Sequence, residues 1–141
     1  MSYDLAVFDP EAAPKKRAAF IAWYDAQTEW EEPHRYNDPV VSTPALRAWF
    51  LEMIREFPAM NGPHAARDGD VDDRRRTDYS VGRTLIYAAF AWSQAGPAYE
   101  AVFGLAAKHA IGFLDASGET GEVWLPDGRG GLMLAHASRP T

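Results

Sequence analysis

The longest uninterrupted apolar stretch of the chain covers residues 84–92 and contains no charged residue, proline or glycine. A two-residue period places apolar side chains on both sides of this stretch. A strand that is apolar on both sides is covered from both sides or lies inside its sheet. The pattern therefore predicts a central strand, around which the other elements are arranged.

Shorter apolar or alternating runs predict the remaining strands. The predicted strands cover residues 3–8, 77–81, 84–92 and 111–114, with a fifth over residues 122–125. Gly82-Arg83 separates the second strand from the third, which favours a hairpin. The glycine-containing segment 126–141 is predicted as a C-terminal tail that follows a single domain over residues 1–125.

An i, i+3, i+4 spacing of apolar residues predicts three helices. The first begins near Pro14 and extends to about Trp30, and the third begins at Gly96-Pro97. The second begins at Thr43-Pro44, a capping residue followed by proline in the first turn. Its apolar stripe is the most regular and consists of Leu46, Trp49, Phe50, Met53, Ile54 and Phe57.

The order of these elements, β-α-α-β-β-α-β, predicts an α+β fold with an antiparallel sheet of four to five strands and helices mainly on one face. Without one of the first two helices, this order is that of a split βαβ, or ferredoxin-like, unit. The first and third strands are central in that topology, and residues 3–8 and 84–92 are the two most apolar predicted strands. We therefore expect a ferredoxin-like variant.

The composition is that of an ordinary globular domain, with 141 residues, 47% of them hydrophobic and 24% charged. The chain contains no cysteine, which excludes disulfides, thiolate nucleophiles and cysteine-ligated zinc. The sequence opens without the basic and apolar regions of a signal peptide, and no apolar run reaches the roughly 20 residues of a membrane span. We therefore expect a cytoplasmic protein that does not bind membranes.

The formal net charge of −6 disfavours nucleic acid as the partner, because binding to phosphates needs basic patches. Only Arg74, Arg75 and Arg76 form a basic cluster, and acidic residues lie on both sides of it. An acidic surface favours a basic partner or serves solubility. The sequence leaves the oligomeric state open.

No established catalytic motif is present in the sequence. The four histidines are His34, His64, His109 and His136, and none lies three or four residues from another, as paired metal ligands on a helix do. We therefore expect no catalytic residue, no cofactor and no metal ion.

One charged segment resembles a calcium loop only in part. Asp68-Gly-Asp70-Val-Asp72 alternates carboxylates as such loops do. The sixth and twelfth positions are Asp73 and Tyr79, where a calcium loop requires glycine and glutamate. The segment therefore predicts a solvated surface loop over residues 67–78.

The segment after the first predicted helix interleaves acidic and aromatic residues and is the candidate partner-binding site. Its residues are Glu29, Trp30, Glu31, Glu32, His34, Tyr36 and Asp38. In such a surface, aromatic side chains anchor a partner and charges steer a basic one toward it. Two other interpretations stay open. In the first, Glu32 and His34 act as a general acid–base pair. In the second, Trp30 closes the first predicted helix onto the core and the acidic residues are only solvated.

A second functional hypothesis is a small-molecule-binding protein or small enzyme, with a pocket between the sheet and the loop over residues 31–42. The residues expected to line it are Tyr24, Trp30, His34, Tyr36 and Trp49. An enclosed cavity at this place favours the hypothesis, whereas a flat or convex acidic face favours protein binding.

Several stretches of the sequence resemble a family of small uncharacterised bacterial proteins with the same opening. They are Ser2 to Val7, Thr43 to Arg47, Tyr87 to Ala95 and Ala106 to His109. The resemblance covers most of the chain but carries over no catalytic residue, so it implies the fold more than the function. Some small acidic proteins of this kind act as immunity partners of secreted toxins. The resemblance therefore implies a non-enzymatic protein-binding module that neutralises a bacterial toxin, with a basic toxin domain as its partner.

Overall fold

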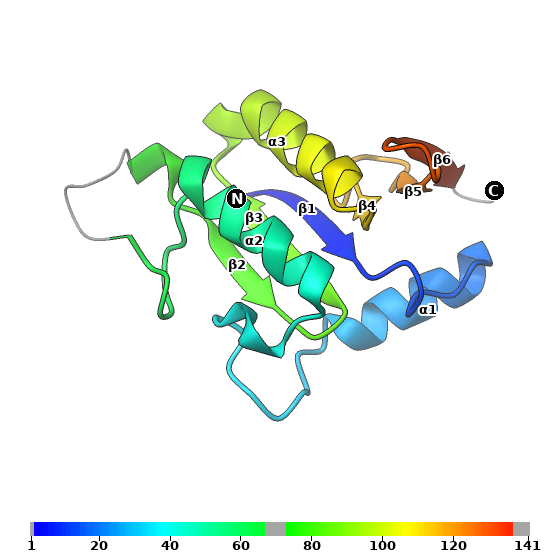
Figure 1. Cartoon of the computed structure of the whole chain (residues 1–141), viewed down its shortest axis with the longest axis horizontal. Helices are drawn as coiled ribbons and strands as arrows, with labels where there is room; N and C mark the ends of the chain where they lie inside the picture. Colours follow the sequence, from blue (N-terminus) through cyan, green and yellow to red (C-terminus); the bar gives the residue numbers. More distant parts are fainter. Residues whose placement is uncertain (1, 67–72, 137–141) are drawn as a thin grey trace.

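The computed structural model describes residues 2–66 and 73–136, which form an α+β fold (Figure 1). Within these residues one antiparallel sheet contains β1 (Tyr3–Phe8), β2 (Asp78–Val81), β3 (Leu85–Phe90), β4 (Gly112–Leu114), β5 (Val123–Pro126) and β6 (Leu132–His136). The helices are α1 (Arg17–Gln27), α2 (Pro44–Glu56) and α3 (Ala95–Lys108), with short 3-10 turns η1 (Pro39–Val41), η2 (Asp73–Arg75) and η3 (Trp92–Gln94). The strand order across the sheet is β2-β3-β1-β4-β5-β6.

Strand β3 lies inside the sheet, as its apolar pattern predicts. It pairs with β2 on one side and with β1 on the other, both in antiparallel orientation. The β2–β3 pair is the predicted hairpin, closed by a hydrogen bond of 2.8 Å from the Gly82 N–H to the Leu85 carbonyl. The central position of β3 brings side chains from β2, β3 and β1 into one row across the sheet.

One face of the sheet is covered by α2 and α3, which lie side by side in Figure 1. The stripe predicted on α2 is buried, with Trp49, Phe50 and Met53 at most 1% exposed. The Trp49 indole N–H also donates to the Val102 carbonyl of α3 at 3.4 Å. Each large apolar side chain buried in this way contributes about 1.5–3 kcal/mol. This face is therefore a closed core.

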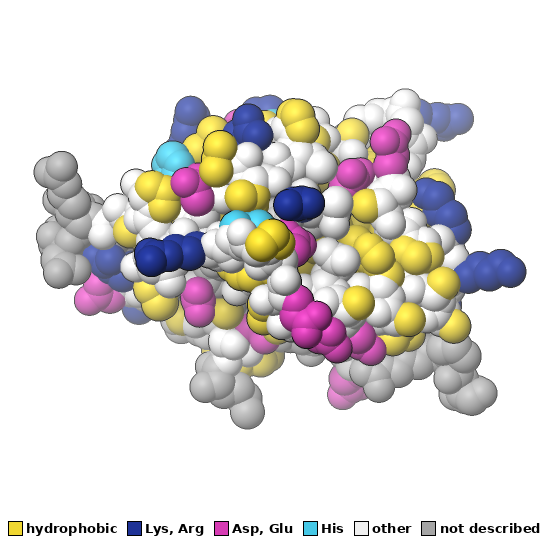
Figure 2. All heavy atoms as spheres, turned by 90° about the horizontal axis from the view of Figure 1, so that it is seen from below, with side chains coloured by type: hydrophobic (Ala, Val, Ile, Leu, Met, Phe, Trp, Pro, Cys, Tyr) yellow, Lys and Arg dark blue, Asp and Glu magenta, His cyan; other side chains and the backbone are white. Residues whose placement is uncertain are grey.

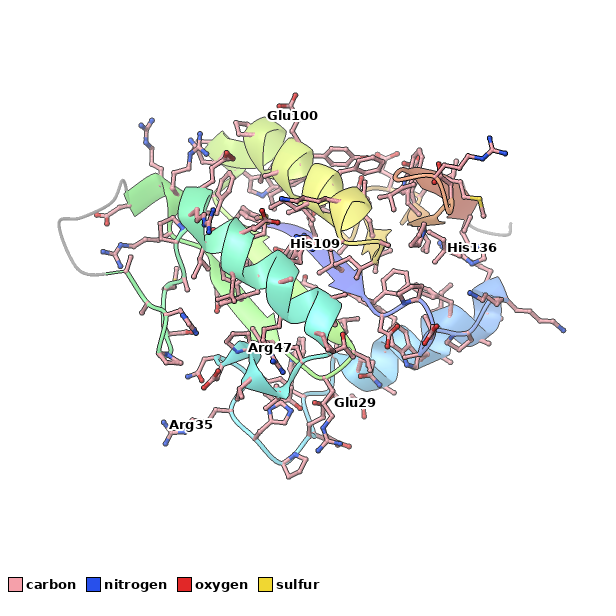
Figure 3. All side chains as sticks on the ribbon, in the orientation of Figure 1. Glu29, Arg35, Arg47, Glu100, His109 and His136 are labelled. Atoms are coloured by element: carbon pink, nitrogen blue, oxygen red, sulfur yellow. The ribbon has the colours of Figure 1, made fainter. Side chains whose placement is uncertain are left out.

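The two helices of this face are also joined near the surface. The Glu52 carboxylate on α2 accepts a hydrogen bond from Lys108 Nζ at 2.6 Å and is bonded to His109 Nε2 (Figure 3). Both bonds lower the pKa of Glu52, with the bond to Lys108 contributing most. The cluster links the middle of α2 to the C-terminal end of α3.

Of the described helices, only α1 covers the opposite face of the sheet. Ala6, Phe8 and Leu85 point to this side and pack with Phe20 of α1 in a second, smaller core. The rings of Phe8 and Phe20 meet edge to face at 5.2 Å. Two helices thus lie on one face, and α1 covers the other because the even-numbered side chains of β1 also need cover.

The sheet has six strands in the described residues, so the predicted number of four to five is wrong. The additional strand, β6, lies in segment 126–141, for which the sequence predicts a tail. The Asp127 carboxylate accepts hydrogen bonds from Arg129 N–H at 2.6 Å and Gly131 N–H at 3.1 Å. Gly128 and Gly130 adopt positive φ angles, which glycine tolerates without steric penalty. This turn returns the chain along β5, and the tail prediction missed it.

Helix α1 begins at Arg17, later than the predicted start near Pro14. The Asp9 carbonyl accepts hydrogen bonds from the N–H groups of Ala12 and Ala13, at 3.1 and 3.3 Å. Residues 9–13 therefore form a turn that separates β1 from the helix.

The predicted charged loop lies partly outside the described residues, and Asp68, Asp70 and Asp72 belong to the part that is not described. Its end is described from η2 onward, and Arg76 is bonded to the Asp73 carboxylate at 3.0 Å. Among the helices of the described residues, none has the length and apolar content needed to cross a membrane.

Candidate functional site

The loop between α1 and α2 carries the candidate site and is bound to the β2–β3 hairpin. The Tyr36 carbonyl accepts a hydrogen bond from the Val81 N–H of β2 at 2.9 Å. The buried Ser42 hydroxyl donates to the Gly82 carbonyl in the hairpin turn at 2.7 Å. The loop is therefore fixed to the sheet near its middle and at its end.

Arg47 of α2 holds the end of the same loop (Figure 3). Its guanidinium donates to the carbonyls of Pro39, Val40 and Ser42 at 3.2–3.3 Å. Asp38 caps η1 by accepting a hydrogen bond from the Val40 N–H at 3.0 Å. Asp38 thus shapes the loop, and its carboxylate already has a partner.

Glu32 and His34, predicted as a possible acid–base pair, are in contact. Glu32 Oε1 lies 2.5 Å from His34 Nε2, and His34 Nδ1 lies 3.0 Å from the Arg35 carbonyl. Because both ring nitrogens face acceptors, only the protonated imidazole satisfies both bonds. The bond to the Arg35 carbonyl and the Glu32 carboxylate raise the pKa of His34. Glu32 Oε1 also accepts from the Arg83 N–H at 3.1 Å, so the pair holds the loop on the hairpin.

The aromatic side chains of the loop form one cluster that continues onto β3. The Trp30 ring lies 5.1 Å from Tyr36 and 6.3 Å from Tyr87, in edge-to-face orientations. The Tyr36 hydroxyl accepts a hydrogen bond from the Glu32 N–H at 2.5 Å. Trp30 has a φ of 56°, in the left-handed region that residues other than glycine seldom adopt. Trp30 therefore packs on the smaller core in a fixed position, and its ring stays partly exposed.

Glu29 and Glu31 are the exposed acidic residues of the loop. Neither carboxylate forms a hydrogen bond or ion pair within the described part of the chain. Figure 2 views this side of the molecule and shows acidic side chains gathered beside an area of hydrophobic ones. Glu29 lies where the loop leaves α1, and Arg35 points outward at the far side of the loop (Figure 3).

A hollow of about 360 Å³ opens beside Trp30, between the end of α1 and the uncovered part of the sheet. It is lined by Tyr24, Thr28, Trp30, Asp78, Ser80, Tyr87 and Ala89. Its floor comes from β2 and β3, where Asp78 is paired with Ala89 and Ser80 with Tyr87. The small side chain of Ala89 leaves the space that its larger neighbours surround.

A second carboxylate lies next to this hollow, on β1. Asp4 is paired with Ala89 on the side opposite Asp78. The Tyr87 hydroxyl donates to one Asp4 oxygen, and the Ser2 hydroxyl donates to the other at 2.6 Å. The hydroxyl groups satisfy the Asp4 oxygens without neutralising their charge.

The two tyrosines of the hollow keep their protons well above neutral pH. Burial, together with the charges of Asp4 and Asp25, raises the pKa of Tyr24 to about 12. Burial and the hydrogen bond to Asp4 raise the pKa of Tyr87. Both side chains therefore present neutral rings and hydroxyl groups at neutral pH.

The predicted site residues fall into two groups in the structure. Glu29 and Glu31 are exposed and have no partner in residues 2–66 and 73–136, whereas the others make contacts inside the loop, namely Trp30, Glu32, His34, Tyr36 and Asp38. The structure brings these residues together on one loop, but only the first group is available as unpaired surface charge.

The residues predicted to line a pocket are only partly brought together. Tyr24 and Trp30 line the hollow, while His34 and Tyr36 lie in the adjoining loop. The prediction is wrong for Trp49, which is fully buried in the core on the opposite face of the sheet. The apolar stripe of α2 faces that core and turns Trp49 away from the loop.

Sequence reasoning missed the polar residues that the strands contribute, chiefly Asp4, Asp78 and Tyr87. One signal was present, because the alternation of residues 3–8 places Asp4 on the same side as Ala6 and Phe8. The β2–β3 hairpin places Asp78 beside Ala89, whereas Asp4 reaches the other side of Ala89 by the long-range pairing of β1 with β3, which no local pattern indicates.

The arrangement offers carboxylates, aromatic rings and hydroxyl donors, a combination suited to holding a cationic or hydrogen-bonding group. Within residues 2–66 and 73–136, no three histidine, aspartate or glutamate side chains are grouped so that they would hold a metal ion. Comparisons of the chain with protein-family models, with curated proteins and with solved structures give no match.

Proposed function

We propose that this protein is a non-enzymatic binding module for a basic protein partner, and that the partner is a bacterial toxin which it neutralises. The observation that carries the proposal is a pair of exposed acids, Glu29 and Glu31, which have no partner among the described residues and lie on a loop that is bonded to the sheet. A loop whose backbone is already held loses less conformational freedom on binding, which favours recognition.

Charge and loop structure both support a binding role for this surface. The net charge of −6 attracts a basic protein, and exposed charges steer it over about 8–10 Å at ordinary ionic strength. Trp30 and Tyr36 of the same loop pack ring against ring, stay partly exposed and supply apolar contact. Because the Glu32–His34 pair is engaged in holding the loop, a catalytic role for it is disfavoured.

The choice of a toxin as the partner rests on the resemblance to small acidic bacterial proteins, some of which are immunity proteins. The proposal includes a cytoplasmic location, where an immunity protein meets an incoming toxin. Its first test is the neighbouring gene in the source organism. Co-expression of this chain should restore growth to cells that produce the toxin encoded there.

The surface is tested by reversing its free charges. We expect Glu29→Lys combined with Glu31→Lys to slow association with the toxin about tenfold at low salt, and the difference to shrink as salt is raised. The matched control is Glu100→Lys combined with Glu119→Lys, which makes the same change of net charge at exposed positions elsewhere. Equal association rates for the two double variants, or no rescue by the unmodified chain, would overturn the proposal.

A second candidate function is a small-molecule-binding protein or a small enzyme. The hollow lined by Tyr24 and Trp30 favours it, because its volume of about 360 Å³ lies in the range of small-ligand pockets. A small molecule that copurifies with the chain, and whose binding is lost on filling the hollow, would favour this function over protein binding.

We also propose that β1, α2, β2, β3, α3 and β4 form a ferredoxin-like unit, to which α1 and the β5–β6 hairpin are additions. The strand order β2-β3-β1-β4 and the position of α2 and α3 on one face support this description. In this description the candidate site lies where α1, an addition, meets β2 and β3 of the unit.

A further inference from the structure

We propose that the hollow beside Trp30 binds a cationic side chain, the ammonium of a lysine or the guanidinium of an arginine. The proposed function supplies the source of this group, a residue of the basic protein partner, and the inference rests on that function for the partner. The chemistry of the hollow itself defines the cation.

Two carboxylates lie on either side of Ala89. Asp78 and Asp4 are both paired with Ala89, one on each neighbouring strand. Adjacent strands are about 4.8 Å apart, so the two residues are separated by roughly 10 Å with the small alanine between them. Within the described residues neither carboxylate has a lysine, arginine or histidine partner. A cation above Ala89 would interact with both.

Aromatic rings form the wall of the hollow. Tyr24, Trp30 and Tyr87 surround the same space, and a cation within about 6 Å of such rings is attracted by their π faces. The packing of Trp30 against Tyr36 and Tyr87 fixes its ring before a ligand arrives. The volume of about 360 Å³ also accommodates the aliphatic stem of a lysine or arginine.

The lining also disfavours other ligand classes. Among the described residues that line the hollow, there is no lysine, arginine or histidine, so an anion would find no opposite charge there. The hydroxyl groups of Thr28 and Ser80, together with the Asp78 carboxylate, make the rim polar, which disfavours an apolar ligand. The Asp78 carboxylate in the lining, the Asp4 carboxylate beside it and the aromatic rings on the wall are together the features that recognise ammonium and guanidinium groups.

The test uses small probes, so that it does not depend on the partner. We would titrate the ¹⁵N-labelled chain with n-butylguanidinium chloride, n-butylammonium chloride and n-butylurea at low salt. The amide signal of Ala89 and the indole N–H signal of Trp30 would be followed by NMR. We expect saturable shifts with the two cations, with dissociation constants on the order of 1–10 mM, and none with the neutral urea. The cation that binds more tightly identifies the side chain of the partner.

Two variants separate a specific site from general attraction to an acidic protein. Asp78→Asn should weaken cation binding about fivefold or more, whereas Glu119→Gln, which removes one exposed charge elsewhere, should leave it unchanged. Ala89→Leu keeps all charges but fills the hollow, and it should abolish the shift of the Trp30 indole signal. Equal shifts with n-butylurea, or equal losses in Asp78→Asn and Glu119→Gln, would overturn the proposal.

The outcome is distinguishable from that of the proposed function. If the hollow binds no cation but charge reversal of Glu29 and Glu31 still slows capture of the toxin, only the proposed cation site is refuted. If the probes bind as expected but no toxin is captured, the cation site stands and its partner is of another kind.

Discussion

The two faces of the sheet differ in how completely they are covered. On one face, α2 and α3, of 13 and 14 residues, bury Trp49 and Phe50 to 1% exposure or less. On the other, α1 has 11 residues, and Trp23, Tyr24 and Tyr87 stay partly exposed around its smaller core. A single short helix does not cover the strands at the β2 side of the sheet.

Polar residues of the strands gather where this cover is missing. Asp4, Asp78 and Ser80 all point to the face of α1, while Leu5, Val7 and Ile86 point to the closed core. The closed core therefore requires apolar residues on one side of each strand. Some positions on the other side can carry charged or polar side chains. In the proposed function, the closed face supplies stability and the less covered face supplies the binding surface.

The largest expected change in stability comes from replacing a buried tryptophan, and a tryptophan on the other face of the sheet serves as the comparison. Trp49→Ala should lower the free energy of unfolding by about 3–5 kcal/mol, because it empties a closed core and removes the bond to Val102. Trp23→Ala should lower it by about 1–2 kcal/mol, since its ring is partly exposed and contacts Phe8 and Phe20 from the rim. Urea denaturation measures both values. Equal losses would mean that the face of α1 is as closed as the other.

A second prediction concerns the tightest contact on the face of α1. A β carbon added at Gly112 would lie 2.2 Å from Cζ of Phe8, which Phe20 holds in place. We expect Gly112→Ala to destabilise the fold by about 1–3 kcal/mol, because the Phe8 ring must shift inside its core. Phe8→Leu in the same chain should recover part of this loss. If the double variant is no more stable than Gly112→Ala, the strain lies elsewhere.

The smallest expected effects are on the pH dependence of stability. Glu52 and His34 should contribute to it in opposite directions. Glu52 joins α2 to α3, and its pKa is lowered from the ordinary value of 4.5. Its contribution to stability is therefore present above pH 4.5 and is lost as the pH falls through the folded pKa. The difference in unfolding free energy between the wild-type chain and Glu52→Gln should shrink in acid.

His34, in the loop on the other side, should show the reverse. Its pKa is raised above 6.5, so its contribution is present below that pH and is lost as the pH rises through the folded value. Urea denaturation of wild type and His34→Gln from about pH 4.5 to pH 9 should show a difference that is largest at the acid end. A difference that does not vary with pH would contradict the protonated His34 inferred from its two bonds.

Much of the fold follows from local patterns in the sequence. The period of α2 predicts its buried stripe, and the apolar run of β3 predicts a strand inside the sheet. The β6 strand was missed because the turn before it depends on hydrogen bonds that the Asp127 carboxylate accepts from the backbone N–H groups of Arg129 and Gly131. No hydrophobic pattern reveals such bonds.

The candidate site was predictable as a segment but not as a geometry. The interleaved acids and aromatics mark residues 29–38, yet which acids stay free depends on the fold. Glu32 is engaged because the loop meets the hairpin turn at Arg83, whereas Glu31 is exposed and has no such bond to any described residue. The hollow requires β2 and β3 to be paired in register, and Asp4 reaches its side only through the pairing of β1 with β3, which joins distant parts of the chain.

The pairing of the first strand with distant partners has a consequence for the speed of folding. β1 pairs with β3 and β4, and the bond between Tyr87 and Asp4 spans 83 positions of the chain. Sheets built from such distant pairings fold slowly, because a long loop must close before any contact forms. At a synthesis rate of about 5–20 residues per second, roughly 4–17 s pass between the emergence of β1 and that of its partner. During that interval the apolar β1 segment is open to incorrect pairing with other chains.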